Sequence, residues 1–243
     1  MLSDKLSSVL EAKSQAMLDR LGIFPPPVDA IAVARGLGMV VAKDANQQSR
    51  GRFVRLPLPG LNKQESILLR PESRPERRQW ATAHEIGESI AYQIVAEWGQ
   101  DPRDLPHGAR EQLANLFATR LLLPGSCFFP DVTKTDCDLL ELKGLYKTAS
   151  FELIAKRLLD SDKMAVVTIV DKSKISFRRG PQFRPVPGIT NDERVCLKIV
   201  HDSGKPYQRS GAAMFVQGWA IHEPDWKREI LVSTPHVAQG ASM

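Results

Sequence analysis

The sequence has few of the features that mark secreted or membrane proteins. Its 243 residues include only three cysteines, Cys127, Cys137 and Cys196, which are widely spaced and form no C-x-x-C pair. A disulfide framework or a cysteine zinc site is therefore not expected, and the compartment is predicted to be reducing. No apolar run reaches transmembrane length, and the N-terminal segment lacks the apolar core of a signal peptide. We expect a soluble, cytoplasmic protein with no membrane partner.

A strong excess of one charge is also lacking. The net charge is +5, and residues 171–243 hold 11 Lys or Arg against 7 Asp or Glu. Nucleic-acid-binding surfaces usually show clustered positive charge, whereas this excess is mild. We expect an ordinary solvated face, and direct nucleic-acid binding is not predicted. Hydrophobic residues make up 42% of the chain, which is enough for a globular core.

The most informative stretch runs from Arg77 to Pro124 and predicts two helices. The first contains H-E-I-G-E, in which His84 and Glu88 share a helix face and Glu85 lies one step round. Two ligands at this spacing can hold a metal ion, with the Glu after the first ligand as general base. The usual pattern is H-E-x-x-H, so a carboxylate stands here in place of the second imidazole. Taken alone, the tetrad is better explained as a solvated helix face, because Glu is a good helix former.

The second predicted helix changes that interpretation. It contains the run E-Q-L-A-N-L-F-A-T-R-L-L-L-P, which begins at Glu111. An H-E-x-G-x helix followed by this run resembles the ImmA/IrrE family of metallopeptidases, over about residues 28–160. The resemblance implies that His84, Glu88 and Glu111 are metal ligands and that Glu85 is the catalytic base. Three protein ligands with one open position are typical of catalytic zinc sites.

The resemblance also implies a cofactor and a substrate class. The implied ion is Zn²⁺. Several family members cleave a helix-turn-helix transcriptional repressor, which implies regulatory proteolysis of a protein substrate in a stress-response or toxin–antitoxin setting. Two carboxylate ligands formally cancel the charge of a divalent ion, and oxygen ligands favour harder ions such as Mn²⁺. We therefore expect slower or more alkaline hydrolysis, a different metal or no metal, and tighter zinc binding in Glu88→His.

His107 lies four residues before Glu111, in the loop G-Q-D-P-R-D-L-P-H-G-A-R. If the second helix begins early enough, His107 shares a face with Glu111, where it could replace the missing imidazole or hydrogen-bond a reaction intermediate. The alternative is a solvent-exposed histidine in a loop or first turn, which is the more frequent situation for a solitary histidine.

Periodicity predicts an α+β fold that begins with a mainly helical domain carrying a small sheet, the zincin-like arrangement that the resemblance implies. The motif helix is expected to start with a capping box of Ser73 and Glu76 and to end at Gly99. Gly87 inside it would let a neighbouring element approach closely. The elements expected before the motif are helices at 3–21 and 28–37 and strands at 39–42, 51–55 and 66–70.

The first domain is expected to span residues 1–164 and to include a pair of short helices at 136–160 that resembles a helix-turn-helix. Such a pair can bind DNA or support the peptidase domain by packing. The second helix of the pair exposes Lys156 and Arg157 as its obvious cations, which is little for phosphate contacts, so we favour packing.

Residues 165–243 are expected to form a β-rich C-terminal domain, a small antiparallel sheet or barrel whose role the sequence does not indicate. This part contains His201, His222 and His236, but no pair has the spacing of metal ligands, so we expect no catalytic residue there. The expected strands are at 165–170, 174–179, 194–200, 212–221 and 229–234.

Three functions are compatible with this sequence. The first is a metal-dependent peptidase in which Glu85 accepts a proton from the attacking water and passes it to the leaving amine. The second is a catalytically impaired relative that acts as a regulatory protein-binding module. The third, DNA binding through residues 136–160, is the least favoured. Bound metal separates the first from the second, and salt-dependent duplex binding would reveal the third.

Overall fold

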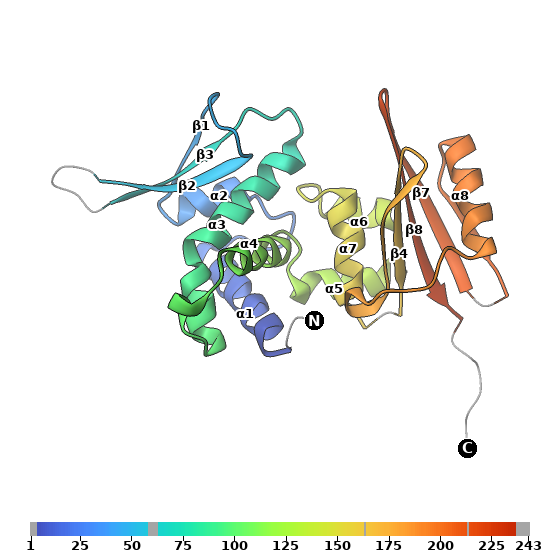
Figure 1. Cartoon of the computed structure of the whole chain (residues 1–243), viewed down its shortest axis with the longest axis horizontal. Helices are drawn as coiled ribbons and strands as arrows, with labels where there is room; N and C mark the ends of the chain where they lie inside the picture. Colours follow the sequence, from blue (N-terminus) through green and yellow to red (C-terminus); the bar gives the residue numbers. More distant parts are fainter. Residues whose placement is uncertain (1–3, 58–62, 163, 213, 237–243) are drawn as a thin grey trace, which may run out of the picture. The chain divides into compact units, whose positions relative to one another are not determined.

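The computed structural model describes residues 4–57, 63–162, 164–212 and 214–236, apart from the side chain of His107. The chain forms two compact units, shown in Figure 1. The N-terminal unit comprises Leu2–Asp131 and Lys143–Ser150, and the C-terminal unit comprises Val132–Leu142 and Phe151–Met243. The fold is α+β, as the sequence predicts: helices dominate the first unit, and an antiparallel sheet forms the centre of the second.

The N-terminal unit is built from amphipathic helices and one small sheet. In its first helix the buried positions recur every four residues, which is the period of a helix with one core-facing stripe. Helices α5 and α6 have residues in both units. The elements described from residue 4 to 145 are α1 (Asp4–Leu21), α2 (Ala30–Gly36), β1 (Val40–Lys43), β2 (Gly51–Leu56), β3 (Gln64–Leu69), α3 (Pro75–Trp98), the 3-10 turn η1 (Pro102–Asp104), α4 (His107–Leu122), α5 (Gly125–Lys134) and α6 (Leu139–Leu145).

The small sheet has the order β1-β3-β2, so β2 lies at its edge within the described residues. β1 runs parallel to β3, and β2 runs antiparallel to it with Phe53 opposite Ile67. Ile67 is fully buried, whereas β2 is only partly covered. Helix α3 contacts both β2 and β3, and Figure 1 shows the sheet beside this helix. The strands expected at 39–42, 51–55 and 66–70 are confirmed to within a residue or two.

The ends of the motif helix agree only in part with the sequence prediction. The capping box expected from Ser73 and Glu76 is wrong: the N-cap residue is Arg74, which makes no side-chain capping bond, and Pro75 occupies the first turn. Proline suits that position because its missing N–H would have no helical partner there. The Glu76 carboxylate instead accepts a hydrogen bond from Lys143 Nζ at 2.8 Å. The end at Gly99 is confirmed, with a left-handed φ of +89°.

The C-terminal unit contains one element that the sequence prediction assigned wrongly. Residues 194–200 were expected to form a strand, but they lie within α8. A capping box between Thr190 and Glu193 starts this helix, and the buried positions Glu193, Cys196 and Val200 are three and four residues apart, which is helical spacing. The elements described after residue 150 are α7 (Phe151–Arg157), the 3-10 turn η2 (Leu158–Asp160), β4 (Val166–Asp171), β5 (Lys174–Arg179), the 3-10 turn η3 (Pro181–Phe183), α8 (Asn191–Ser203), β6 (Tyr207–Ser210), β7 (Met214–Glu223) and β8 (Trp226–Pro235).

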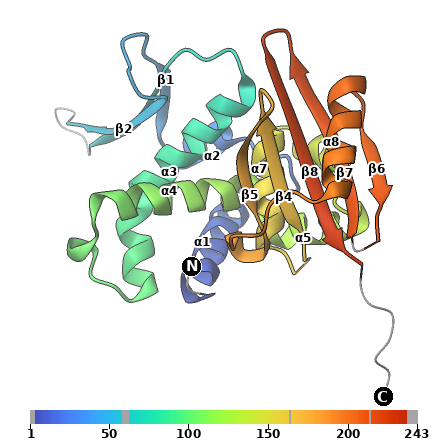
Figure 2. The same cartoon turned by 45° about the vertical axis from the view of Figure 1, so that its right-hand side comes forward.

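The sheet of this unit is antiparallel and has the strand order β5-β4-β8-β7-β6. Helix α8 covers one face of it, and α7 packs against β4 and β8 from the other face, as Figures 1 and 2 show. A Cβ atom at Gly218 of β7 would lie 2.9 Å from Cys196 Sγ and from Val200 Cγ2, so this glycine sets how closely α8 approaches the sheet. Cys196, Val200, Val216 and Leu231 form the core between them.

The helix pair expected at 136–160 is present as α6 and α7, each of seven residues. Leu139 and Leu142 of α6 and Ile154 of α7 are fully buried, which is the role that the packing interpretation requires. Among the described residues, no helix combines the length and the apolar character needed to cross a membrane.

Candidate metal centre

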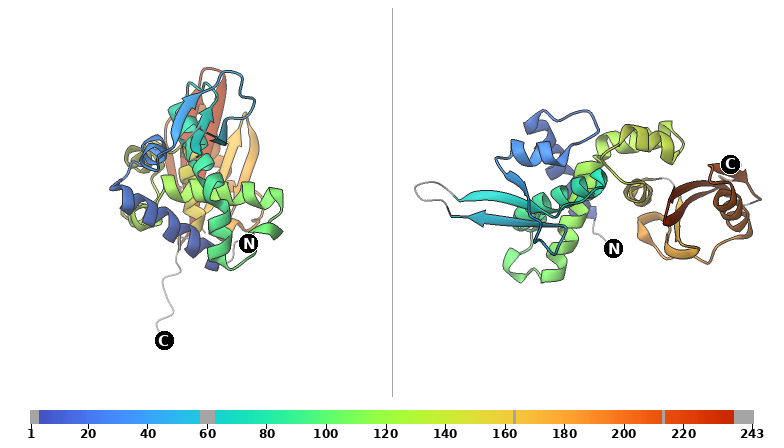
Figure 3. Two further views of the ribbon diagram at one scale, coloured as in Figure 1. Left: turned by 90° about the vertical axis from the view of Figure 1, so that its left-hand side faces the viewer. Right: turned by 90° about the horizontal axis from the view of Figure 1, so that it is seen from above.

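The candidate site forms where α3 crosses α4. Gly87 lies at the crossing: a Cβ atom built there would lie 2.9 Å from Ala114 Cα and 3.0 Å from the Ala114 carbonyl oxygen. Any larger residue would separate the helices, which confirms the close approach expected from this glycine. The crossing places Glu111 of α4 next to the face of α3 that carries His84 and Glu88. The right-hand panel of Figure 3 gives a second view of these helices beside the small sheet.

His84, Glu88 and Glu111 are brought together as the sequence predicts. Each residue offers one ligand atom, and these three atoms lie within 4.8 Å of one another. His84 Nε2 is 3.5 Å from Glu111 Oε2, close to the separation of about 3.3 Å between two ligands of a tetrahedral zinc ion. The side chains of His84 and Glu88 are mostly buried, whereas 59% of the Glu111 side chain is exposed. The group is therefore open to solvent on the α4 side.

Asn115 orients the imidazole of His84. Its Oδ1 lies 3.0 Å from His84 Nδ1, so a proton on Nδ1 leaves the Nε2 lone pair facing Glu111. A hydrogen bond to the second ring nitrogen is the usual means by which proteins fix a metal-binding histidine. In the sequence Asn115 stands out only as part of the A-N-x-F-A run, which does not predict this contact. Its spacing of four residues from Glu111 on one helix was the available signal.

Glu85 is the most enclosed carboxylate at the site. Glu85 is 7% exposed, and its Oε2 accepts a hydrogen bond of 2.7 Å from the backbone N–H of Phe53 in β2. Burial raises the pKa of Glu85. The charge of His84 and the Phe53 hydrogen bond oppose that rise, and the nearby carboxylates of Glu88 and Glu111 add to it. A carboxylate with a raised pKa is a stronger base, which suits it to proton transfer near neutral pH.

Arg110 is a neighbour that the sequence analysis did not anticipate. Its Nε forms an ion pair of 2.6 Å with Glu88 Oε2, and its guanidinium lies 5.3 Å from the centre of the Tyr92 ring. Arg110 immediately precedes Glu111, so α4 presents a cation to Glu88 and a carboxylate to His84. The positive charge beside Glu88 offsets the extra negative charge that this carboxylate brings to the site.

The donor set fits a divalent metal ion. One imidazole and two carboxylates are ligand types that both zinc and manganese accept, and a divalent ion would balance their charges. The Asn115 contact and the Arg110 ion pair supply the outer hydrogen bonds that such ligands usually have. Zinc suits the imidazole and manganese the carboxylates, so the donors alone do not choose between them.

Comparison with known proteins places this arrangement in a family. Residues 34–159, just over half of the chain, match the model of the IrrE N-terminal-like domain, Peptidase_M78. The chain belongs to this family. The match includes α3, α4 and all four residues of the predicted site. Membership identifies a peptidase-type domain but specifies neither a substrate nor a metal.

Two further comparisons concern the whole chain. Among solved structures, the fold is similar to that of a Mycobacterium tuberculosis transcriptional regulator, with a TM-score of 0.63 and 19% identity over 95% of this chain and 81% of the other. At that identity the likeness shows the fold alone. A comparison with curated proteins finds no match.

The remaining histidines of this IrrE-type chain have different surroundings. Helix α4 begins at His107, so the backbone condition for His107 to share a face with Glu111 is met. The side chain of His107 lies outside the described residues, and its auxiliary role stays a prediction. His201 and His222, which have no ligand spacing in the sequence, lie together beside Glu229 in the C-terminal unit.

Proposed function

We propose that this protein is a metal-dependent peptidase of the IrrE type that cleaves a peptide bond in a protein substrate. The observation that carries the proposal is the convergence of His84, Glu88 and Glu111 beside the buried Glu85 carboxylate. Family membership supports the same reaction class.

Each residue has a distinct role in the proposed reaction. His84, Glu88 and Glu111 would hold a divalent ion, which supplies Lewis-acid polarisation of the scissile carbonyl and of the attacking water when bound. Glu85 accepts the proton of the attacking water and passes it to the leaving amine. The Phe53 N–H keeps the Glu85 carboxylate in place at the site. Asn115 holds the His84 ring in the orientation that directs Nε2 toward Glu111.

Arg110 accounts for how a site with two carboxylates can still activate water. Two carboxylates cancel the charge of a divalent ion, whereas the usual pair of histidines and one carboxylate leave one positive charge. The Arg110 guanidinium, paired with Glu88 at 2.6 Å, restores that single positive charge to the group as a whole. The replacement of His by Glu88 is therefore electrically compensated by a residue from the neighbouring helix.

The proposed substrate is a protein with an extended segment at the cleaved bond. β2 lies at the edge of its sheet in the described part of the chain, and its Phe53 N–H is directed to Glu85. An edge strand beside a catalytic carboxylate suits a peptide that binds as an additional strand. We propose a helix-turn-helix transcriptional repressor as the physiological substrate, the class that the family resemblance implies.

The test combines metal analysis with cleavage. Protein purified without chelator is analysed for bound zinc and manganese, then incubated with candidate repressors, and products are identified by mass spectrometry. We expect Glu111→Ala to hold about one metal ion per chain less than the wild type, and we expect cleavage to stop in Glu85→Gln although that variant keeps its metal. Equal cleavage by wild type and Glu85→Gln would contradict the assigned role of Glu85.

One observation favours a second candidate function, a non-catalytic binding module. The Glu88 carboxylate is already paired with Arg110, so the negative charge of Glu88 is balanced without a bound metal ion. If neither zinc nor manganese binds to His84, Glu88 and Glu111 even in excess, so that Glu111→Ala holds as much metal as the wild type, this second candidate replaces the first, and partner capture becomes the relevant experiment.

A further inference from the structure

A second group of metal-ligating side chains lies in the C-terminal unit. Glu229 is fully buried, and its Oε1 is 2.9 Å from His201 Nδ1 and 2.6 Å from His222 Nε2. The two imidazole rings are 5.9 Å apart and inclined at 71°. One ligand atom from each of the three residues lies within 4.8 Å of the other two.

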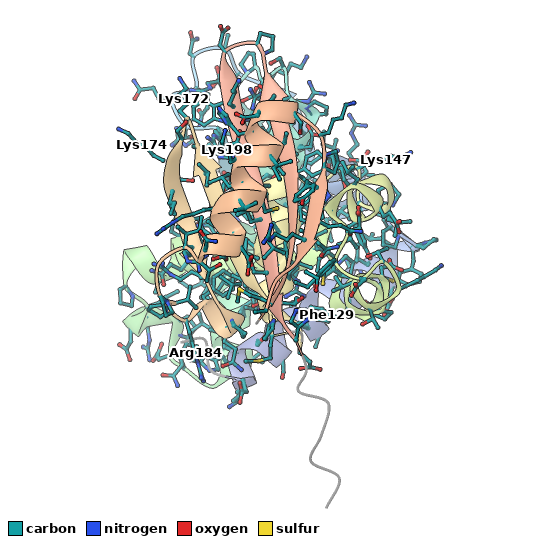
Figure 4. All side chains as sticks on the ribbon, turned by 90° about the vertical axis from the view of Figure 1, so that its right-hand side faces the viewer. Phe129, Lys147, Lys172, Lys174, Arg184 and Lys198 are labelled. Atoms are coloured by element: carbon teal, nitrogen blue, oxygen red, sulfur yellow. The ribbon has the colours of Figure 1, made fainter. Side chains whose placement is uncertain are left out.

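Tertiary structure assembles this group from three elements. Glu229 of β8 is paired with Ala220 of β7, so His222, two residues further along β7, is its diagonal neighbour on the same face of the sheet. That face is the one covered by α8, whose last turn carries His201. Figure 4 shows α8 lying across the sheet, with the exposed Lys198 on its outer side. His201, three residues after Lys198, instead faces Glu229.

The buried carboxylate is incompletely satisfied. Both imidazole contacts go to Oε1, whereas Oε2 is buried and has no hydrogen-bond partner among the described residues. A buried acceptor without a partner is destabilising, and more so when the group is charged. A charged carboxylate at the bottom of the group, with two imidazoles on the solvent side, is the arrangement that a bound cation would stabilise.

We propose that His201, His222 and Glu229 form a second divalent transition-metal site, separate from the candidate peptidase centre. Two imidazoles and one carboxylate are a ligand set typical of zinc. The N–O separations of 2.9 and 2.6 Å are shorter than the value of about 3.3 Å between ligands of a tetrahedral zinc ion, so binding requires a small outward movement of the imidazoles. Both histidines are partly exposed, at 34% and 22%, which permits that movement.

The two partly exposed imidazoles determine from which side a metal ion would enter and which ligand would complete its coordination. Solvent reaches the histidine side of the group, whereas Glu229 closes the other side. Three protein ligands leave a fourth position for water or a small anionic ligand on the open side. Because the ligands come from α8, β7 and β8, a bound ion would fix the end of α8 to the sheet.

The test uses the full chain in a variant that lacks the first site, His84→Ala/Glu111→Ala. Zinc is titrated by calorimetry and by competition with a chromogenic chelator. We expect one zinc per chain in this variant, and affinity lower by more than about 100-fold after the further change His201→Ala/His222→Ala. Glu229→Gln, which keeps the shape of the side chain, should also weaken binding. His236→Ala is the matched control and should leave binding unchanged.

A second measurement identifies the ligands directly. Long-range ¹H–¹⁵N spectra of the histidine rings should show zinc-dependent shifts at His201 Nδ1 and His222 Nε2 and none at His236. No zinc binding by the His84→Ala/Glu111→Ala variant would overturn the proposal, as would binding that survives His201→Ala/His222→Ala. Neither result bears on the peptidase proposal, which depends on the difference in metal content between the wild type and Glu111→Ala and on the cleavage activity of Glu85→Gln.

Discussion

The carboxylate of Glu85 occupies the space that a side chain at position 51 would need. A Cβ atom at Gly51 would lie 2.8 Å from Glu85 Oε1 and 2.9 Å from Glu85 Cγ. Gly51→Ala should therefore displace the carboxylate from the Phe53 N–H without touching the proposed ligands. We expect catalytic turnover to fall by about tenfold or more, since misplacement of a catalytic group by about 1 Å can cost 100-fold.

Metal content distinguishes this effect from general damage at the site. Gly51→Ala should bind as much metal as the wild type while it cleaves more slowly, and kcat should change more than KM. Normal turnover in Gly51→Ala would mean that Glu85 does not need its present position.

Arg110 gives a prediction in which affinity and activity change in opposite directions. Arg110→Ala removes the positive charge beside Glu88 and frees Glu88 from its ion pair. The group of ligands then carries more negative charge. We expect metal to bind about tenfold more tightly, which corresponds to about 1.4 kcal/mol, while turnover falls because the ion polarises water less.

The matching control is the same change in a Glu88→His background. Without the carboxylate at position 88, Arg110 has no partner there, and Arg110→Ala should not tighten metal binding. Equal tightening in both backgrounds, measured by competition titration, would show that Arg110 does not act through Glu88.

At the scale of the secondary-structure elements, the crossing of α3 and α4 depends on Gly87. Ala is preferred to Gly inside a helix by about 1 kcal/mol, so propensity alone predicts that Gly87→Ala stabilises the protein. The contact of the added Cβ with the Ala114 backbone opposes this, because overpacking typically costs about 1–3 kcal/mol. We expect a net loss of stability and of metal, because α4 must move and carry Glu111 with it.

Gly144→Ala is the control for this prediction. Gly144 lies in α6, and a Cβ atom built there meets no atom of the described residues within 4 Å. Chemical unfolding should find Gly144→Ala equal to or more stable than the wild type, and Gly87→Ala less stable. A stable, metal-binding Gly87→Ala protein would show that the helices can separate without loss of the site.

At the scale of the whole molecule, stability at acid pH should depend on one buried ion pair. Glu193 is fully buried, and both of its oxygens accept hydrogen bonds from Arg178, at 2.9 and 3.1 Å. Burial alone would raise the pKa of Glu193. Hydrogen bonds from Arg178, the Thr190 N–H and Ser233, together with the charge of Arg178, lower it below its ordinary 4.5. The stabilisation is therefore complete above about pH 4.5 and is lost as pH falls through the lower folded-state pKa.

Two variants test that linkage by urea unfolding at several pH values. Arg178→Ala leaves Glu193 buried without its cation and should cost roughly 3–5 kcal/mol at neutral pH. Glu193→Gln should reduce the fall in stability below pH 4.5 relative to the wild type. An unchanged pH profile in Glu193→Gln would mean that other carboxylates govern acid unfolding.

The N-terminal unit was largely predictable because its signals are local. The spacing of apolar residues predicted α1 and α3. Glycines with a left-handed φ follow the ends of two helices, Gly38 after α2 and Gly99 after α3. The ligand set was implied by the family resemblance of the H-E-I-G-E helix and the run that begins at Glu111. The capping box at Ser73 failed because Pro75 already satisfies the start of α3 without a side-chain cap.

The C-terminal unit was predicted less well because its signals are ambiguous. The apolar run 194–200 fits a strand and a helix alike, and the capping box at Thr190, which decides for a helix, was not recognised. The group of His201, His222 and Glu229 has no signal in the sequence, because it depends on the register between β7 and β8 and on the position of α8.

The sequence by itself determined the α+β class and the two site helices, since these follow from residue order within single elements, and its resemblance to a family implied the candidate ligands and base. Tertiary structure alone decided that Arg110 pairs with Glu88, that Asn115 contacts the His84 ring and that Gly51 makes room for Glu85. It also brought His201, His222 and Glu229 together. The physical reason is that hydrophobic burial fixes how helices and strands pack, and residues distant in sequence meet only where that packing places them.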